Sequence, residues 1–312
     1  MSIPGTPRAD RTHWYRRIGR VSGALAFASL ATGVGAEAQE PATPAPGQQV
    51  VLVTGSTSGL GWEVASRMAA RGAHVIVHGR NSEKGAQLVS EIMQEGQGSA
   101  RFYRADFASF SQVREFGEAI LRDYDRLDVL VNNAGFGSAP NERLLSDDGH
   151  EFRFQVNYLS HFLLTDMLMP RLLGSAPSRI VNVSSLAQRP IDFDDVMIEN
   201  DFSGGRAYGQ SKLAQIMHTL DLAEELDGTG VFAASLHPAT YMPTGMVLRA
   251  GVQPRATIDE GADAVMQLIV SDLIESGQFF RGLEPARAND QAYDLGARAR
   301  LKRLSEELTG IR

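Results

Sequence analysis

From Gln49 onward, short apolar runs alternate with longer segments in which apolar residues recur at helical spacing. The runs show no alternation of apolar and polar positions, which is typical of strands buried on both faces of a parallel sheet. They span residues 50–54, 74–79, 100–104, 128–132, 179–184 and 231–236. The pattern therefore predicts a sheet enclosed between two layers of helices.

The segments between and after these runs predict helices. They cover residues 60–71, 82–95, 109–124, 148–173, 206–227 and 258–273. A last segment, 291–309, places Leu301, Leu304 and Leu308 on one face and stops at Gly310, a residue type that often ends helices. Strand–helix alternation at this spacing predicts an α/β fold. We expect a single doubly wound (Rossmann) domain over 49–312, with a parallel sheet of about seven strands and helices on both faces.

The first 38 residues differ in composition from the rest of the chain. Residues 1–20 carry five arginines and one acid, and a run of small apolar residues over 21–35 precedes Ala36-Glu37-Ala38. This order predicts a signal peptide over 1–38, which would make the mature protein periplasmic or secreted. As a helix the apolar run would rise about 22 Å, short of the roughly 30 Å hydrocarbon core, so we expect no stable membrane span.

Arg16-Arg17 ahead of this run resembles a twin-arginine export signal. The stretch that follows, 39–48, is rich in proline and alanine and reads as a linker. An alternative stays open, in which residues 1–38 are an extension on a cytoplasmic protein or follow a start assigned too far upstream.

Charge and composition exclude several classes of function. A formal net charge of -7 argues against a general affinity for nucleic acid or anionic lipid. The absence of cysteine excludes disulfides, thiolate catalysis and sulfur-ligated metals. The closest histidines, His74 and His78, flank a predicted strand in which four residues span roughly 13 Å, too far to share one ion. We therefore expect no metal site.

The first apolar run leads into Thr54-Gly55-Ser56-Thr57-Ser58-Gly59-Leu60-Gly61. Glycines between a strand and a helix let the backbone turn sharply and approach a pyrophosphate, which then sits at the helix N-terminus. The alternative is a tight strand–helix turn with no ligand. The position of the turn favours a dinucleotide site.

Further motifs follow this turn in a fixed order. They are Asn132-Asn133-Ala134-Gly135 after the fourth run, Asn157 in the next predicted helix, Val181-Asn182-Val183-Ser184-Ser185 closing the fifth run, and Tyr208-Gly209-Gln210-Ser211-Lys212 in the helix after it. Together with the glycine-rich turn, they resemble the short-chain dehydrogenase/reductase family over residues 49–310. The resemblance implies a nicotinamide cofactor and hydride transfer.

Tyr208 and Lys212 are i and i+4 on a predicted helix, so their side chains share a face about 6 Å apart. A phenol has a pKa near about 10, and an adjacent ammonium is expected to bring that pKa closer to neutrality. The resemblance implies that Tyr208 is the acid/base and that Lys212 also binds the nicotinamide ribose. It further implies that Ser185, rather than Ser184, holds the substrate oxygen and that Asn157 anchors a water beside Lys212.

The end of the second run indicates the cofactor. NAD enzymes place an acid there to bind the ribose hydroxyls, whereas this chain has Gly79 followed by Arg80, whose guanidinium can pair with a 2′-phosphate. NADP is predicted rather than NAD; the alternative is a surface arginine on an NAD enzyme. Asp106, with Phe107 beside it, resembles the family's adenine-binding aspartate. The resemblance extends the cofactor site to Gly55, Ser56, Ser58, Gly59, Leu60, Gly61, Asn133, Ala134, Gly135, Tyr208, Lys212, Pro238 and Thr244.

Two segments depart from the family's usual pattern. After the sixth run the chain has Pro238-Ala239 where the family has Pro-Gly, and alanine resists positive φ. Ser185 and Tyr208 are 23 residues apart (208 - 185), a longer gap than usual, and the insert between them is acidic. It is either a solvated loop or part of the substrate pocket. With the C-terminal residues 304–310, the insert resembles the retinol dehydrogenase-like branch, which does not fix a retinoid as substrate.

The prediction is an NADP-dependent alcohol dehydrogenase or carbonyl reductase that acts on a small-molecule alcohol or carbonyl substrate. Two other functions stay open on the same scaffold: a nucleotide-sensing binding protein and an enzyme that reduces a C=C bond. The resemblance also allows a homo-oligomer paired through the helices that hold Asn157 and Tyr208. The sequence leaves the substrate's identity and the direction of the reaction open.

Overall fold

The structure is a computed structural model that describes residues 42–311 of the chain. These residues belong to one compact unit, which begins at Ala42. The predicted signal peptide and the first residues of the predicted linker, 39–41, lie outside the described residues. Gln48, at the end of that linker, donates a hydrogen bond to the Gly72 carbonyl oxygen and accepts one from the Ser99 hydroxyl. The linker is thus already attached to the domain at its last residue.

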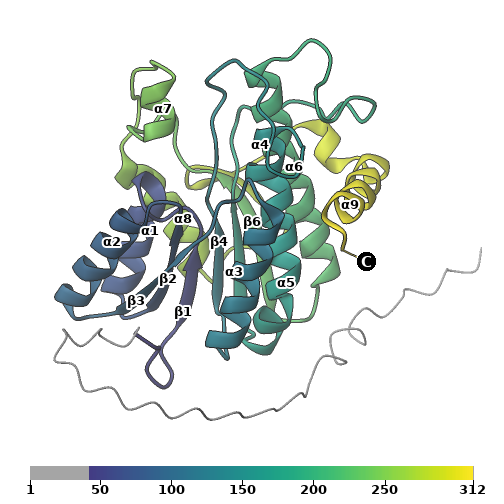
Figure 1. The fold of residues 1–312 in the computed structure, drawn as a ribbon. Helices are drawn as coiled ribbons and strands as arrows, with labels where there is room; N and C mark the ends of the chain where they lie inside the picture. The colour runs from purple at the N-terminus through teal and green to yellow at the C-terminus, as the bar shows by residue number, and fades with distance from the viewer. Residues whose placement is uncertain (1–41, 312) are drawn as a thin grey trace, which may run out of the picture. The chain divides into compact units, whose positions relative to one another are not determined.

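One eight-stranded sheet forms the centre of the fold, in the order β3-β2-β1-β4-β5-β6-β7-β8 (Figure 1). The strands are β1 (Val50–Val53), β2 (His74–Gly79), β3 (Ser99–Arg104), β4 (Val129–Asn132), β5 (Ser178–Val183), β6 (Val231–His237), β7 (Phe279–Arg281) and β8 (Glu284–Ala286). All pairings are parallel except that of β7 with β8. The prediction of a doubly wound α/β domain is confirmed, and β8 adds an antiparallel edge strand to the predicted seven.

Helices cover both faces of the sheet (Figure 1). One layer contains α1 (Gly59–Ala70), α2 (Ser82–Glu95) and α8 (Ile258–Val270); the other contains α3 (Phe110–Asp123), α5 (Ser160–Gly174) and α6 (Gly204–Glu225). The C-terminal helix α9 (Leu295–Thr309) packs against α6. Successive strands are added on one side of β1 up to β3 and on its other side from β4 onward, so a crevice forms at the carboxyl ends of β1 and β4, where such folds bind ligands.

The helix predicted over 148–173 differs from the structure. It begins with the short α4 (Phe152–Phe154), continues as a π-helical turn, η3 (Gln155–Leu159), and only then becomes α5. A π-turn inserts one residue into the helical repeat and is frequent at functional sites. The sequence pattern did not separate it from an ordinary helix, because both carry the same apolar spacing.

Two shorter elements were not predicted. α7 (Gly245–Arg249) lies in the segment after β6, and the 3₁₀ turn η4 (Asp290–Tyr293) precedes α9. α6 also starts earlier than predicted, because the Ser203 side chain accepts a hydrogen bond from the Arg206 amide and caps the helix.

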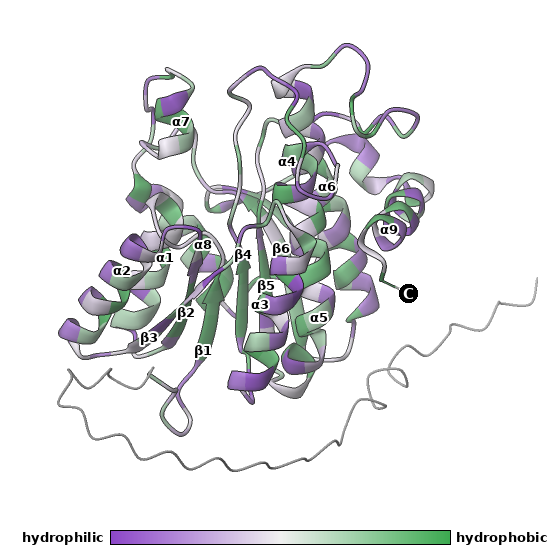
Figure 2. Cartoon of the chain, viewed as in Figure 1, coloured by the Kyte–Doolittle hydropathy of each residue, from purple (hydrophilic) through white to green (hydrophobic). Residues whose placement is uncertain are grey.

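The core follows most of the predicted apolar runs, of which β1 and β4 are green in Figure 2. Every residue of β1, β2 and β4 is buried, as the uninterrupted apolar pattern requires. Within residues 42–311, no helix combines the length and apolar character needed to cross a bilayer.

Candidate active site

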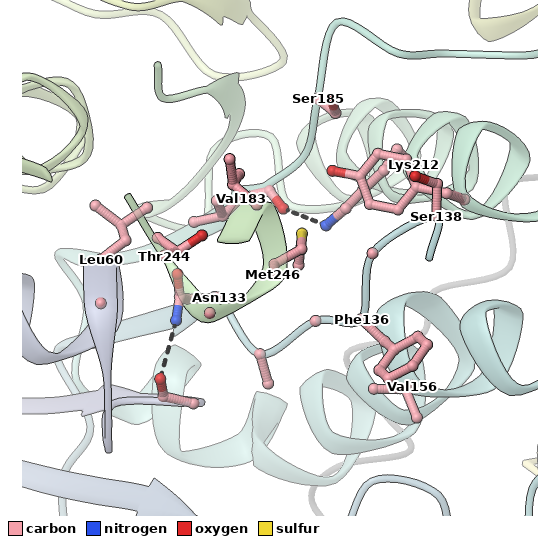
Figure 3. Close-up of a pocket in the computed structure, with 18 of the residues that line it drawn as sticks. Leu60, Asn133, Phe136, Ser138, Val156, Val183, Ser185, Lys212, Thr244 and Met246 are labelled. Atoms are coloured by element: carbon pink, nitrogen blue, oxygen red, sulfur yellow. Dashed lines mark hydrogen bonds between the residues drawn. The ribbon is translucent and has the colours of Figure 1, made fainter. Parts of the chain in front are cut away.

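A cleft of about 1230 Å³ opens at the carboxyl edge of the sheet. Its walls come from the β1–α1 turn, the ends of β2 and of β4 to β6, the first turn of α6 and the segment around α7 (Figure 3). Typical small-molecule pockets measure roughly 300–1,000 Å³. The cleft is therefore large enough for a dinucleotide together with a second molecule.

On the glycine-rich side of the cleft, backbone segments lie so close together that no side chain fits between them. Gly55 has φ +67°, and a Cβ there would lie 2.8 Å from the Ala134 Cα atom. A Cβ on Gly61 would lie 2.5 Å from the Gly55 carbonyl oxygen. The turn at the start of α1 consequently exposes bare backbone to the cleft, as a phosphate-binding turn requires.

Thr54 joins this turn to the end of β4. Its hydroxyl oxygen accepts hydrogen bonds from the backbone amides of Asn133, at 2.9 Å, and of Ala134, at 3.0 Å. The same hydroxyl contacts the Nε2 atom of His161 at 3.0 Å. The sequence motif contains Thr54 but does not indicate this role, because a threonine at a strand end is equally typical of the core.

His78 supports the glycine turn from the other side. Its Nδ1 atom accepts a hydrogen bond from the Gly55 amide at 3.1 Å, and its ring is stacked between Phe107 and Phe116. Burial lowers the pKa of His78 to about 4, so the ring is neutral and can act as an acceptor. The position of His78 in the sequence does not reveal this contact with the glycine turn. In the described residues 42–311, no cluster of histidine and carboxylate side chains could hold a metal ion.

Asn157 lies in the π-turn η3, behind the wall of the cleft. Its side-chain amide donates to the Phe136 carbonyl oxygen and to the Ser211 hydroxyl, and its Oδ1 atom accepts from the Phe136 amide. A Cβ placed on Gly135 would meet both Asn157 Oδ1, at 3.3 Å, and Lys212 Nζ, at 3.7 Å. Asn157 therefore holds the loop after β4 in place beside Lys212.

Tyr208, Ser185 and Lys212 meet at the centre of the cleft, where β5 ends and α6 begins. The Ser185 side chain lies close enough to the Tyr208 hydroxyl to lower the pKa of the phenol. Lys212 Nζ lies 5.8 Å from the centre of the Tyr208 ring and donates to the Val183 carbonyl oxygen at 2.8 Å (Figure 3). The neighbouring Ser184 hydroxyl instead donates to the Lys212 backbone oxygen, so Ser185 is the serine that faces Tyr208.

The pKa values of this pair differ from the expectation. Burial raises the pKa of Tyr208 above its ordinary value, and the nearby Ser185 side chain lowers that pKa in part. Burial also lowers the pKa of Lys212 to about 7. The predicted shift of the tyrosine toward neutrality is therefore wrong for the protein as described, because desolvation exceeds any effect of the lysine charge.

Arg80 and Asp106 meet at the far end of the cleft, beyond the glycine turn. Arg80 is largely exposed, and its guanidinium lies 3.4 Å from an Asp106 carboxylate oxygen. A Cβ on Gly79 would lie 2.4 Å from the Thr57 hydroxyl oxygen. The end of β2 consequently has no room for an acidic side chain in the present arrangement.

The structure brings nearly all the sequence-predicted site residues to one cleft. Only Ser56 and Asn157 do not line it. Ser56 is fully buried; its amide donates to the His78 carbonyl oxygen, and its hydroxyl accepts from the His78 amide. The prediction that Ser56 binds cofactor is therefore corrected, since both of its polar groups join β1 to β2.

The backbone of Ala239, in the loop after β6, does not adopt the positive φ that alanine disfavours. Tyr241, not residue 239, has a positive φ of 53°. Pro238 lines the cleft, and Thr244 lines it at the N-terminal end of α7. Met246 of α7 packs over Gly137, where a Cβ would lie 2.5 Å from the methionine Cγ atom (Figure 3). The helix thus faces the loop after β4 across the cleft.

The acidic insert divides into two parts. Residues 186–189 line the cleft, whereas Asp192 and Asp194 form ion pairs outside it, with Arg206 and Arg300. The first part of the insert therefore belongs to the cleft, and the part around Asp192 and Asp194 is a solvated loop.

The short-chain dehydrogenase model matches residues 49–253, which hold the glycine turn, Ser185, Tyr208 and Lys212. The chain belongs to the short-chain dehydrogenase family.

Similar proteins refine this family assignment. Human retinol dehydrogenase 12 is 36% identical over 280 residues, which cover 86% of this chain and 88% of that protein. Mouse retinol dehydrogenase 13 is 35% identical over 287 residues, with 85% of each chain covered. The predicted resemblance to the retinol dehydrogenase-like branch is thereby confirmed, and the chain is an oxidoreductase of the short-chain dehydrogenase family.

A solved structure agrees in fold. A short-chain dehydrogenase from Burkholderia cenocepacia, in complex with NADP, has a TM-score of 0.61 and 26% sequence identity. The similarity covers 75% of this chain and 95% of that one. It indicates that a fold of this kind accommodates a nicotinamide dinucleotide.

Proposed function

We propose that this short-chain dehydrogenase transfers a hydride between NADP(H) and an alcohol/carbonyl substrate, with Tyr208 as the acid/base. The observation that carries the proposal is the Tyr208 phenol, which lies beside Ser185 in the same cleft as the glycine turn and a buried lysine. Export of the chain, with residues 1–38 as the signal peptide, is part of the proposal and rests on the sequence pattern alone.

The cleft supports a nicotinamide dinucleotide in three places. The close approach of Gly55 to Ala134 and of Gly61 to Gly55 leaves bare amides where a pyrophosphate would bind. Lys212, whose Nζ atom lies beside Gly135, would hold the nicotinamide ribose. The crowding at Gly79 disfavours an acid at the end of β2, and Arg80 there supplies a cation for a 2′-phosphate. This combination favours NADP over NAD.

The bound nicotinamide would supply or accept the hydride, and the chain's own residues manage the proton. With its pKa raised by burial, the Tyr208 phenol stays protonated at neutral pH and can donate its proton to a carbonyl oxygen. Ser185 can hydrogen-bond the same oxygen. In the reverse direction, the alcohol proton returns to the tyrosine oxygen.

The decisive experiment is an assay of NADPH consumption over a panel of aldehydes and ketones. We expect turnover with at least one carbonyl substrate and an alcohol as the product. Tight NADPH binding without consumption across the panel would instead support a nucleotide-sensing protein. A product whose carbonyl is intact and whose C=C bond is reduced would support the other alternative.

Arg80→Ala is expected to raise KM for NADPH roughly 10- to 100-fold and leave KM for NADH nearly unchanged. A charge-assisted hydrogen bond contributes about 1.5–3 kcal/mol, which corresponds to this range. The measurement is steady-state kinetics with both cofactors. Arg71→Ala is the matched control, because Arg71 is an exposed arginine after α1 that does not line the cleft. An equal loss with both cofactors would contradict the assignment of Arg80 to the 2′-phosphate.

A further inference from the structure

The charges that line the cleft are unbalanced. Five cationic side chains line it, from Arg80, Arg189, Arg206, Lys212 and Arg249, against one acidic side chain, from Asp106. Asp106 lies beside Arg80 at the cofactor end. The chain as a whole carries a formal net charge of -7, so the cleft is a local cationic region on an acidic protein. A cleft of one charge sign concentrates ligands of the opposite sign.

Arg189 and Tyr208 line the same cleft. A Cβ on Gly209, the residue after Tyr208, would be 2.5 Å from the Arg189 Cγ atom, so the arginine stem lies directly against the first turns of α6. Among residues 42–311, the Arg189 guanidinium has no hydrogen-bond or ion-pair partner. An exposed, unpaired guanidinium at the wall of a cleft is free to bind an incoming anion.

The backbone on both sides of Arg189 is fixed. The Gln188 side chain donates to the Ser185 carbonyl oxygen and accepts from the Asn289 amide. Ile191 exchanges two hydrogen bonds with the Gln291 side chain, at 2.6 Å and 3.0 Å. The insert is therefore anchored to η4, and this anchoring holds Arg189 at the cleft wall.

Two more arginines add positive charge to the cleft. Arg206, two residues before Tyr208, is paired with Asp192, whose carboxylate does not line the cleft. Arg249 extends from α7, and its guanidinium folds back toward Gly245. Within the described part of the chain, no acid is paired with Arg249.

Apolar side chains also line the cleft, together with polar ones such as Ser138 and Gln188. The apolar residues include Phe136, Phe152, Val156, Leu186 and Met246. Figure 3 labels Phe136, Val156 and Met246 in the same site as Ser185. A substrate bound here therefore contacts apolar surface along its body.

We propose that the substrate is a carbonyl compound with an apolar body and a carboxylate, which Arg189 binds while the carbonyl lies at Tyr208. Arg206 and Arg249 strengthen the attraction without being required for the direct contact. The planar guanidinium matches a carboxylate through two parallel hydrogen bonds. This inference rests on the proposed function, since it assigns the substrate class of the same site.

The test compares ω-oxo carboxylates of increasing chain length with their methyl esters, using NADPH consumption as the readout. Each pair shares the same distant aldehyde, so intrinsic reactivity is equal and only the charge differs. We expect kcat/KM to favour the carboxylates by roughly tenfold at one optimal chain length. This ratio corresponds to about 1.4 kcal/mol, a typical contribution of a hydrogen bond to a charged group. The preference is expected to fall with added salt.

Arg189→Gln is expected to lower kcat/KM for the carboxylates roughly tenfold more than kcat/KM for the esters, and Arg189→Lys is expected to restore part of the preference. Arg303→Gln is the matched control, because Arg303 is exposed on α9 and does not line the cleft. Equal activity toward carboxylates and esters at every chain length would overturn this inference and leave the proposed function standing. A loss of ester activity in Arg189→Gln equal to the loss of carboxylate activity would also overturn it. Failure to consume NADPH with any aldehyde would overturn the proposed function itself.

Discussion

Tyr208→Phe is expected to lower the rate of carbonyl reduction by roughly 10²- to 10⁴-fold, the usual contribution of a positioned acid/base. The variant keeps the aromatic ring in the wall of the cleft and removes only the hydroxyl, which lies near Ser185. NADPH binding is expected to persist, because the glycine turn and Lys212 are unchanged. Stopped-flow absorbance with enzyme in excess measures the hydride step, and NADPH fluorescence measures binding.

Tyr103→Phe is the matched control for this variant. The Tyr103 hydroxyl donates to Asp123 at 2.8 Å, and the residue does not line the cleft. Its removal is expected to leave the rate of reduction within about twofold. Wild-type turnover in Tyr208→Phe would refute the role given to the tyrosine.

The pH dependence follows from the same hydroxyl. Because the pKa of Tyr208 is raised, the proton needed for reduction is present through neutral pH and is lost only in the alkaline range. Alcohol oxidation needs the deprotonated form, so its rate is expected to rise with pH over that range.

Arg153→Met is expected to lower the free energy of unfolding by about 3–5 kcal/mol, the typical effect of leaving one partner of a buried ion pair alone. Arg153 and Glu151 are both fully buried, with 3.2 Å between guanidinium and carboxylate. Arg153 also donates to the carbonyl oxygens of Gly137, Ser138 and Pro140 in the loop that lines the cleft. Urea denaturation followed by circular dichroism measures the loss.

Two further variants test whether the unpaired charge causes the lower free energy of unfolding. Adding Glu151→Gln to Arg153→Met is expected to recover part of the stability, because the amide removes the unpaired charge and can still accept the hydrogen bond from the Phe154 amide. Arg143→Met is the control, since the Arg143 pair with Glu199 is longer, at 3.8 Å, and Glu199 is exposed; the change should cost less than about 1 kcal/mol. Equal effects of Arg153→Met and Arg143→Met would contradict a stabilising role for the buried pair.

The sequence predicts the fold well because the parallel strands are buried on both faces. Such strands appear as apolar runs, and the glycines after β1 mark a turn where backbone segments nearly touch. Gly55 and Gly61 illustrate this, since no other residue type fits between their neighbours. The spacing of Tyr208 and Lys212 likewise follows from helical geometry alone.

The sequence predicts poorly whatever depends on contacts between distant segments. Arg153 resembles an exposed residue of an amphipathic helix, and only the folded loop after β4 explains its complete burial. Ser56 occupies a motif position, but the direction of its hydroxyl is set by His78 on the next strand. The raised pKa of Tyr208 reflects the desolvation of the whole cleft, which no local spacing reveals.

The hydrogen bonds of Gln188 and Ile191 to η4 tie one wall of the cleft to a segment about a hundred residues later in the chain. That wall and the C-terminal segment therefore form one structural unit. A chimera that takes the insert from a relative but keeps the native C-terminus would lose the hydrogen bonds that hold the insert against η4. Attempts to redesign selectivity should transplant residues 186–203 and 287–294 together.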